Sequence, residues 1–213
     1  MGLPIPTGLL APKILVVRDW FVNFFLIKAG NGVVCIDSGW RARGTLRGLK
    51  LLGFEPDQVK AVLLTHTDWD HAGGLDCLNS AGIYAGAGLE HPPAGRQKKF
   101  YRSMKAPGER RSYSLVKGGD TLDFGDVRVE VMNTAGHTED SLSYLVFEEW
   151  LFTGDAAWIF GEVSTGPRLI NRDNYAARNS LDSIMSGGKA CWLVTSHTGI
   201  WKIKQRQTES NAE

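Results

Sequence analysis

Two histidines and two aspartates lie within six consecutive residues, in the pattern His66-x-Asp68-x-Asp70-His71. They directly follow residues 59–64, an apolar run of the kind that forms a buried strand. Imidazole and carboxylate groups are common ligands of divalent metal ions in proteins. Because buried charges must be paired or coordinated, four such groups at the end of a buried strand predict a cation site.

Three further side chains that can ligate a metal also follow apolar runs, and these are His137, Asp155 and His197. Four of the five histidines in the chain therefore lie just after an apolar run. If the strands are neighbours and end at the same side of the molecule, all seven side chains converge. A tetrahedral zinc ion accepts four ligands, so seven donors fit two cations that share a bridging carboxylate.

The elements that must position these ligands are predicted from hydrophobic patterning and turn residues. Strands are predicted at 14–17, 21–28, 32–36, 59–64, 82–85, 120–124, 127–132, 141–147, 150–153 and 191–195. Helices are predicted at 41–52, 70–78 and 173–185, with Gly53 ending the first of them. This order is compatible with two sheets packed face to face and helices outside.

The segment from about 92 to 117 has a different character, with eight basic residues against one acidic residue and several aromatic ones between them. Its hydrophobic residues have neither helical nor strand periodicity, so it is predicted to be a loop insertion with at most a short helix. Arg102 and Arg110 are candidate contacts for a substrate phosphate or carboxylate. Trp69, between two ligands, is a candidate for the mouth of the pocket. The alternatives are a solvated surface loop for the arginines and simple packing for Trp69.

Composition limits the class of protein. The 213 residues are 43% hydrophobic and 22% charged, as in ordinary globular proteins, and we expect one domain over 1–213. A net charge of +1 argues against nucleic acid or an anionic membrane as a partner. We see no transmembrane run or signal peptide, and the three cysteines are too few for a disulfide framework. These observations favour a cytoplasmic protein that acts on a small molecule.

Taken together, four motifs resemble the metallo-β-lactamase superfamily in their order and spacing. They are His66-x-Asp68-x-Asp70-His71, Gly136-His137-Thr138, Thr153-Gly154-Asp155 and Ser196-His197. The resemblance extends over nearly the whole chain. It implies an α/β fold, a four-layer αββα sandwich, with a dinuclear metal site at one edge of the two sheets.

The resemblance also implies a role for each ligand. The first cation would be held by His66, Asp68 and His137. The second would be held by Asp70, His71 and His197, with Asp155 bridging the two. Asp37, at the end of its predicted strand, is expected to orient the ligand loop rather than to contact substrate.

Asp68 departs from the usual motif of this superfamily, which has histidine at that position. Three carboxylates and a bridging hydroxide bring about four negative charges to two divalent cations, so the site is close to neutral. A more neutral site favours harder metals such as manganese or iron. Zinc remains the first choice for both ions.

The expected reaction is hydrolysis, in which a metal-bound hydroxide attacks an ester, thioester or lactone carbonyl of a small substrate, which would be anionic if the basic segment binds it. Asp70 is expected to be a ligand first and also a candidate general base. A phosphodiesterase or other phosphoesterase on the same site is the alternative, favoured by Asp68 and by the basic segment. A diiron oxidoreductase and a non-catalytic binding protein remain as third possibilities.

Overall fold

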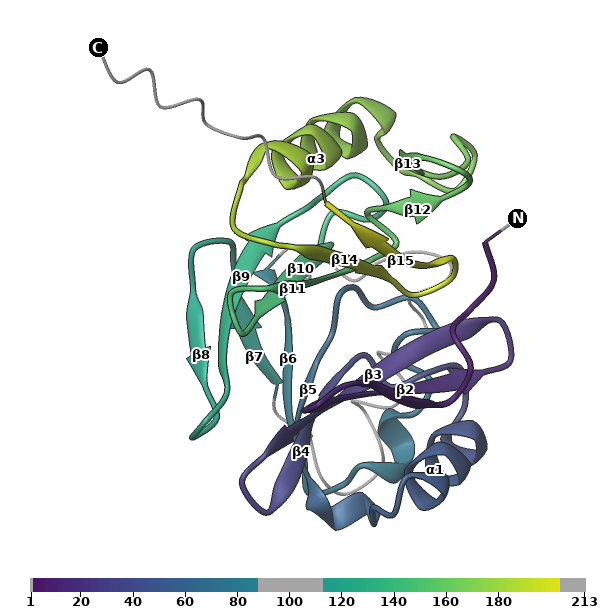
Figure 1. The fold of residues 1–213 in the computed structure, drawn as a ribbon, viewed down its shortest axis with the longest axis vertical. Helices are drawn as coiled ribbons and strands as arrows, with labels where there is room; N and C mark the ends of the chain where they lie inside the picture. The colour runs from purple at the N-terminus through teal and green to yellow at the C-terminus, as the bar shows by residue number, and fades with distance from the viewer. Residues whose placement is uncertain (1, 88–112, 204–213) are drawn as a thin grey trace.

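Two β-sheets lie face to face in the computed structural model, which describes residues 2–87 and 113–203 (Figure 1). Within these residues the first sheet has seven strands, in the spatial order of their numbering. They are β1 (Gly8–Ala11), β2 (Ile14–Asp19), β3 (Val22–Ala29), β4 (Gly32–Ile36), β5 (Val59–Leu63), β6 (Gly82–Gly86) and β7 (Tyr113–Val116). Strands β1 to β4 are antiparallel, whereas β4 to β7 run parallel.

The second sheet has the order β15-β14-β11-β10-β9-β8. Its strands are β8 (Thr121–Asp123), β9 (Arg128–Asn133), β10 (Leu142–Val146), β11 (Trp150–Gly154), β14 (Trp192–Thr195) and β15 (Gly199–Lys202). Strands β11 and β14 are parallel and the other neighbours are antiparallel. A separate short hairpin joins β12 (Trp158–Ile159) to β13 (Val163–Ser164).

Two α-helices cover the outer faces, so the described residues form the predicted αββα arrangement (Figure 1). Helix α1 (Ala42–Leu51) packs on β2, and Gly53 follows it with the positive φ that ends many helices. Helix α3 (Asn174–Ser186) covers the second sheet with a face that includes Leu181 and Ile184. Asp173 begins α3 by accepting hydrogen bonds from two backbone N–H groups of its first turn.

The apolar faces of the two sheets form a common core between them. Phe25 of β3 packs on Phe152 of β11, with ring centroids 4.9 Å apart. Tyr144 of β10 is fully buried in this layer, and its hydroxyl donates to the backbone carbonyl of Leu64 at 2.8 Å. Since Leu64 directly precedes the cluster of histidines and aspartates, this core fixes where that cluster begins.

The predicted helix at 70–78 is wrong. The chain there makes turns and a short 3-10 helix, η2 (Leu75–Cys77), and another, η1 (Pro56–Gln58), precedes β5. Besides short-range turns of its own, the backbone of residues 70–78 bonds to the loop after β4, since Ser38 N–H donates to the His71 carbonyl and Gly73 N–H donates to the Gly39 carbonyl. Gly73 lies so close to the Trp40 backbone that a side chain would collide with it.

Several strands were missed. The last residues of the predicted basic loop, 113–116, form β7 along the edge of β6. The sequence prediction also left out β1, β15 and the β12–β13 hairpin. Residues 88–112, which hold most of the predicted loop, lie outside the described residues. No helix within the described ranges is long and apolar enough to span a membrane.

Candidate metal centre

The ligand loop after β5 is held by one buried carboxylate at the end of β4. Asp37 is fully buried and has φ +62°. Its Oδ1 accepts the backbone N–H of Thr65 at 2.8 Å, and its Oδ2 lies 2.8 Å from Nδ1 of His71. When Nδ1–H of His71 donates to this carboxylate, Nε2 is left as the electron-pair donor. The prediction that Asp37 orients the ligand loop is confirmed by these contacts.

The first group of donors lies between the two sheets. His66 and Asp68 come from the loop after β5, and His137 comes from the loop after β9. Nε2 of His137 lies 3.6 Å from Asp68 Oδ2, and Nε2 of His66 lies 4.0 Å from the same oxygen. All three side chains are buried, and one donor atom from each lies within 4.8 Å of the others.

The second group consists of Asp70 and His71 from the same loop and His197 from the loop between β14 and β15. Nε2 of His71 lies 3.8 Å from Asp70 Oδ2, and Nε2 of His197 lies 3.6 Å from that oxygen. Two donors at about 2.1 Å from one tetrahedral cation are roughly 3.4 Å apart. The spacings in both groups are therefore close to those of ligands that share an ion.

Asp155, directly after β11, lies between the two groups and faces each with a different oxygen. Its Oδ2 is 3.5 Å from Nε2 of His137. Its Oδ1 is 3.1 Å from Nε2 of His197 and 3.4 Å from Nε2 of His71. A carboxylate with one oxygen toward each set of donors has the geometry of a bridging ligand.

The buried donor atoms fit a cation better than they fit one another. Among the described residues, six buried side-chain atoms have no hydrogen-bond partner, and five of them belong to this cluster. They are His66 Nε2, Asp68 Oδ1, His71 Nε2, His137 Nδ1 and Asp155 Oδ1. An unpaired buried polar atom costs about 1–3 kcal/mol. A bound cation would satisfy several of them at once, so the residues present suit divalent metal.

Protonation differs among the donors. Burial lowers the pKa of His71 and of His197, but nearby carboxylates outweigh it and raise both values. His66 and Asp155, by contrast, have the protonation states that bind metal. Burial, together with the neighbouring His71 and His137 rings, holds the pKa of His66 well below its usual range, so this ring is a neutral donor. Burial opposes the ionised form of Asp155, but contacts with His197 and His71 outweigh it and keep its pKa well below the usual value. Neutral imidazoles and ionised carboxylates are the forms that ligate metals.

The three predicted substrate contacts have different outcomes. Trp69 is partly buried, and its ring lies edge-on to Phe21 at 5.8 Å and to Trp40 at 5.6 Å. It therefore belongs to an aromatic group beside the second set of donors. Arg102 and Arg110 lie outside the described residues.

Two residues beside His197 were not identified as part of the site. The rings of Phe21 and Trp158 both stack on this imidazole, although the two residues are far apart in the sequence. Trp158 lies outside the predicted strands, and Phe21 was predicted only as the first residue of a strand. The one feature that distinguishes Phe21 in the sequence is its position next to Trp20, between two apolar runs.

The convergence of these motifs agrees with a comparison against known families. The sequence model of the metallo-beta-lactamase superfamily matches residues 17–197, which include all seven clustered donors. The chain belongs to the metallo-β-lactamase superfamily. The resemblance seen in the motifs is thereby confirmed.

Three curated relatives of this superfamily member are named as hydrolases. A probable metallo-hydrolase of Methanocaldococcus jannaschii is 26% identical over 73% of the chain and 64% of its own length. A hydroxyacylglutathione hydrolase of Hahella chejuensis is 30% identical over 59% of the chain and 43% of its own length. A probable polyketide biosynthesis zinc-dependent hydrolase of Bacillus subtilis is 28% identical over 78% of the chain and 67% of its own length. The chain thus spans about two fifths to two thirds of these relatives.

Solved structures confirm the superfamily fold. A metallo-beta-lactamase family protein of Thermus thermophilus matches with a TM-score of 0.71 and 22% identity, over 92% of the chain and 76% of its own length. A metallo-beta-lactamase from Pontibacter korlensis matches with a TM-score of 0.71 and 17% identity, over 94% of each chain. At these identities the likeness concerns the fold.

Proposed function

We propose that this member of the superfamily is a metal-dependent hydrolase with a dinuclear site. The first cation is assigned to His66, Asp68 and His137, and the second to Asp70, His71 and His197. The observation that carries this assignment is Asp155, whose two oxygens face the two groups separately. Zinc is our first choice, supported by a relative named as a zinc-dependent hydrolase. Asp68 leaves manganese and iron as alternatives.

When bound, such a pair of cations supplies an activated water and polarises the oxygen of the bond to be cleaved. The chain supplies the rest. Among the three clustered carboxylates, Asp70 has the most exposed side chain, at 13%. It is therefore the carboxylate best placed to take a proton from an attacking water while it also serves as a ligand. Asp68 and Asp155 are more enclosed and are assigned to ligation alone.

For the substrate we propose an ester, thioester or lactone of a small molecule. Relatives named as hydroxyacylglutathione hydrolases support acyl chemistry. The aromatic group around Trp69 is suited to an apolar part of such a substrate. Phosphoester hydrolysis is the second candidate, because the near-neutral donor set with Asp68 differs from that of the usual motif.

A metal assay combined with a substrate panel tests this proposal. The purified protein should contain two equivalents of metal, lose activity on chelation and recover it with zinc. It should hydrolyse thioesters or lactones faster than phosphomonoesters and phosphodiesters. Activity on bis-p-nitrophenyl phosphate, without activity on any acyl substrate, would favour the second candidate. Full activity after exhaustive chelation would contradict both.

A further inference from the structure

Two aromatic rings stack on the imidazole of His197. The Phe21 ring is parallel to it within 9°, with centroids 5.7 Å apart. The Trp158 ring is also parallel within 9°, with centroids 4.9 Å apart. Nε2 of the imidazole faces two carboxylates, at 3.1 Å from Asp155 Oδ1 and 3.6 Å from Asp70 Oδ2.

The opposite edge of the His197 ring is fixed by the backbone. Nδ1 lies 2.9 Å from the carbonyl oxygen of Phe21, so Nδ1–H donates to it and Nε2 carries the lone pair. The loop that carries His197 is also attached to β3, two residues after Phe21, because Asn23 N–H donates to the Ser196 carbonyl at 2.7 Å. The turn between β2 and β3 thus sets both the tautomer and the position of this ligand.

Trp158 connects His197 to Asp155. Its indole N–H donates to the backbone carbonyl of Asp155 at 3.2 Å while its ring stacks on the imidazole. Gly166 passes so close to the indole that any side chain there would collide with it. Ile159, which follows Trp158, donates its N–H at 2.8 Å to the hydroxyl of Thr198, the residue after His197. The β12–β13 hairpin is therefore attached to the His197 loop at two points.

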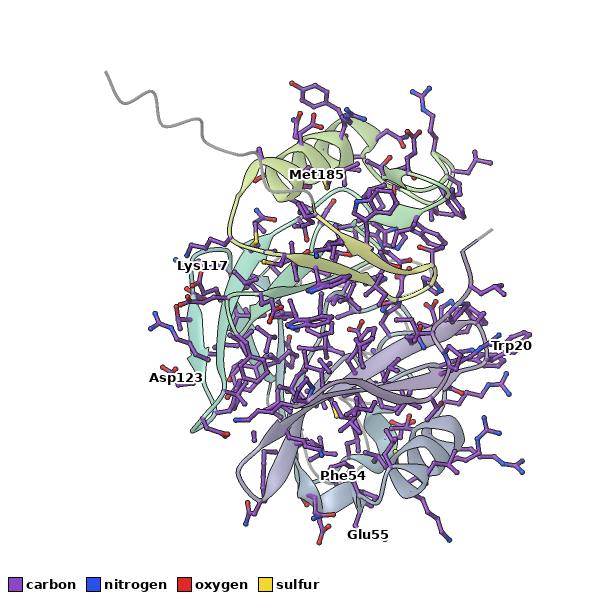
Figure 2. All side chains as sticks on the ribbon, in the orientation of Figure 1. Trp20, Phe54, Glu55, Lys117, Asp123 and Met185 are labelled. Atoms are coloured by element: carbon purple, nitrogen blue, oxygen red, sulfur yellow. The ribbon has the colours of Figure 1, made fainter. Side chains whose placement is uncertain are left out.

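Phe21 is held in place by its own surroundings. It lies in a two-residue turn between Asp19 and Val22, where Trp20 has φ +63°, a conformation that costs energy for a bulky residue. The Phe21 ring packs against Trp20, Trp40 and Trp69. Trp20, 62% exposed, projects outward at this turn (Figure 2). Strain in a turn that contacts a cluster of donors is typical of a functional constraint.

We propose that Phe21 and Trp158 are positioning residues that clamp His197 in the orientation needed to bind the second cation. We call this pair the aromatic clamp. It restricts rotation of the imidazole before any ion is bound, so less freedom is lost on binding. No such pair of rings stacks on His66 or His137 among the described residues. The stacked rings therefore act on the second site, and the clamp reaches the first only through the Trp158 bond to the backbone carbonyl of Asp155.

This inference rests on the proposed dinuclear site, and metal titration tests it without measuring activity. Zinc affinities of the metal-free protein would be measured by competition with a chelator of known affinity. The variants are Phe21→Leu and Trp158→Leu, with Phe21→Tyr and Trp158→Phe as conservative replacements. Trp192→Leu is the matched control, because it removes the Trp150–Trp192 stack, also within 11° of parallel, at the opposite end of β11 and β14.

We expect each leucine variant to weaken the second binding event about tenfold or more, as loss of an outer-sphere partner commonly does. The first affinity should stay within about twofold, and the conservative variants should restore most of the second. Trp192→Leu should retain both affinities. Each side of the clamp is tested separately, so a variant that fails to fold on one side leaves the other to decide.

Two results would overturn the inference in distinguishable ways. If both leucine variants bind two zinc ions with the same two affinities as the wild type, the clamp is wrong and the dinuclear site stands. A leucine variant that retains its fold but binds both zinc ions equally more weakly also overturns the clamp, because the proposal states that the clamp acts selectively on the second site. If the wild type binds fewer than two ions, the proposed site fails and the clamp fails with it.

Discussion

Single side chains decide the protonation and orientation of the donors, and Asp37 shows this most clearly. It is buried, bonds to the backbone of Thr65 and faces Nδ1 of His71. Removing its carboxylate leaves the Thr65 N–H unpaired and frees the imidazole to adopt the other tautomer. The site depends on this residue although we assign it no contact with metal or substrate.

We therefore expect Asp37→Ala to weaken binding of the second cation about 10- to 100-fold. It should also lower the free energy of unfolding by about 1–3 kcal/mol, since a buried donor loses its partner. Zinc competition and urea unfolding measure the two effects. Asp126→Ala removes an exposed aspartate that pairs with Lys13 and serves as the control. Unchanged second-site affinity in Asp37→Ala would contradict the assigned role.

Cys35 on β4 illustrates a buried group without chemistry of its own. Desolvation by burial, reinforced by Cys77, raises the pKa of its thiol far above the usual range. Because the thiolate is the reactive form, Cys35 should remain unlabelled by a disulfide reagent at pH 8 in the native protein. It should react fully after denaturation. Mass spectrometry of labelled peptides would locate the modification, and rapid native labelling of Cys35 would contradict its burial.

The seven clustered donors could be identified from the sequence because their types are unusual at the ends of apolar runs. The role of Phe21 could not, because its carbonyl meets Nδ1 of His197 across 176 positions of the chain. Nothing local to Phe21 indicates that contact. A side chain whose function depends on a distant partner becomes visible only once the strands are arranged in space.

At the scale of elements, local patterns predicted most strands and both α-helices, while contacts between elements overrode them in one place. Residues 70–78 were predicted to be the helix that follows the buried strand, yet they form turns that bond to the loop after β4. Strands β1 and β15 are short edge strands with half-exposed patterns. Their sequences therefore lack the apolar signal that identified β3, β4 and β5.

Helix α1 offers a test of close packing between elements. Gly48 faces β2 so closely that an added methyl group would collide with the Val17 side chain. Gly48→Ala should gain about 1 kcal/mol of helix propensity. Overpacking a buried site costs about 1–3 kcal/mol, and Val17 is too stiff and too buried to move aside. We expect net destabilisation in thermal unfolding, whereas Arg47→Ala on the exposed face should be neutral. A more stable Gly48→Ala protein would contradict this packing.

For the whole molecule, the two sheets must be held in register because each contributes donors to the same site. The Tyr144 hydroxyl on the second sheet bonds to the Leu64 carbonyl beside the ligand loop of the first. Burial raises the pKa of Tyr144 well above its usual value, so the hydroxyl remains a donor at all physiological pH values.

We expect Tyr144→Phe to reduce the free energy of unfolding by about 1–3 kcal/mol, since the buried Leu64 carbonyl loses its side-chain donor and little volume changes. The urea m-value should not change, because the extent of unfolding is the same. Tyr175→Phe, at an exposed tyrosine, is the matched control. Equal stability of the wild type and Tyr144→Phe would show that this bond contributes nothing to the alignment of the sheets.

The presence of two cations on either side of Asp155 is tested most directly by anomalous X-ray scattering from crystals grown with zinc. Our assignment predicts two anomalous peaks, one among His66, Asp68 and His137 and one among Asp70, His71 and His197. An Asp155 oxygen should lie within about 2.2 Å of each. A single peak, or peaks that Asp155 does not contact, would contradict it.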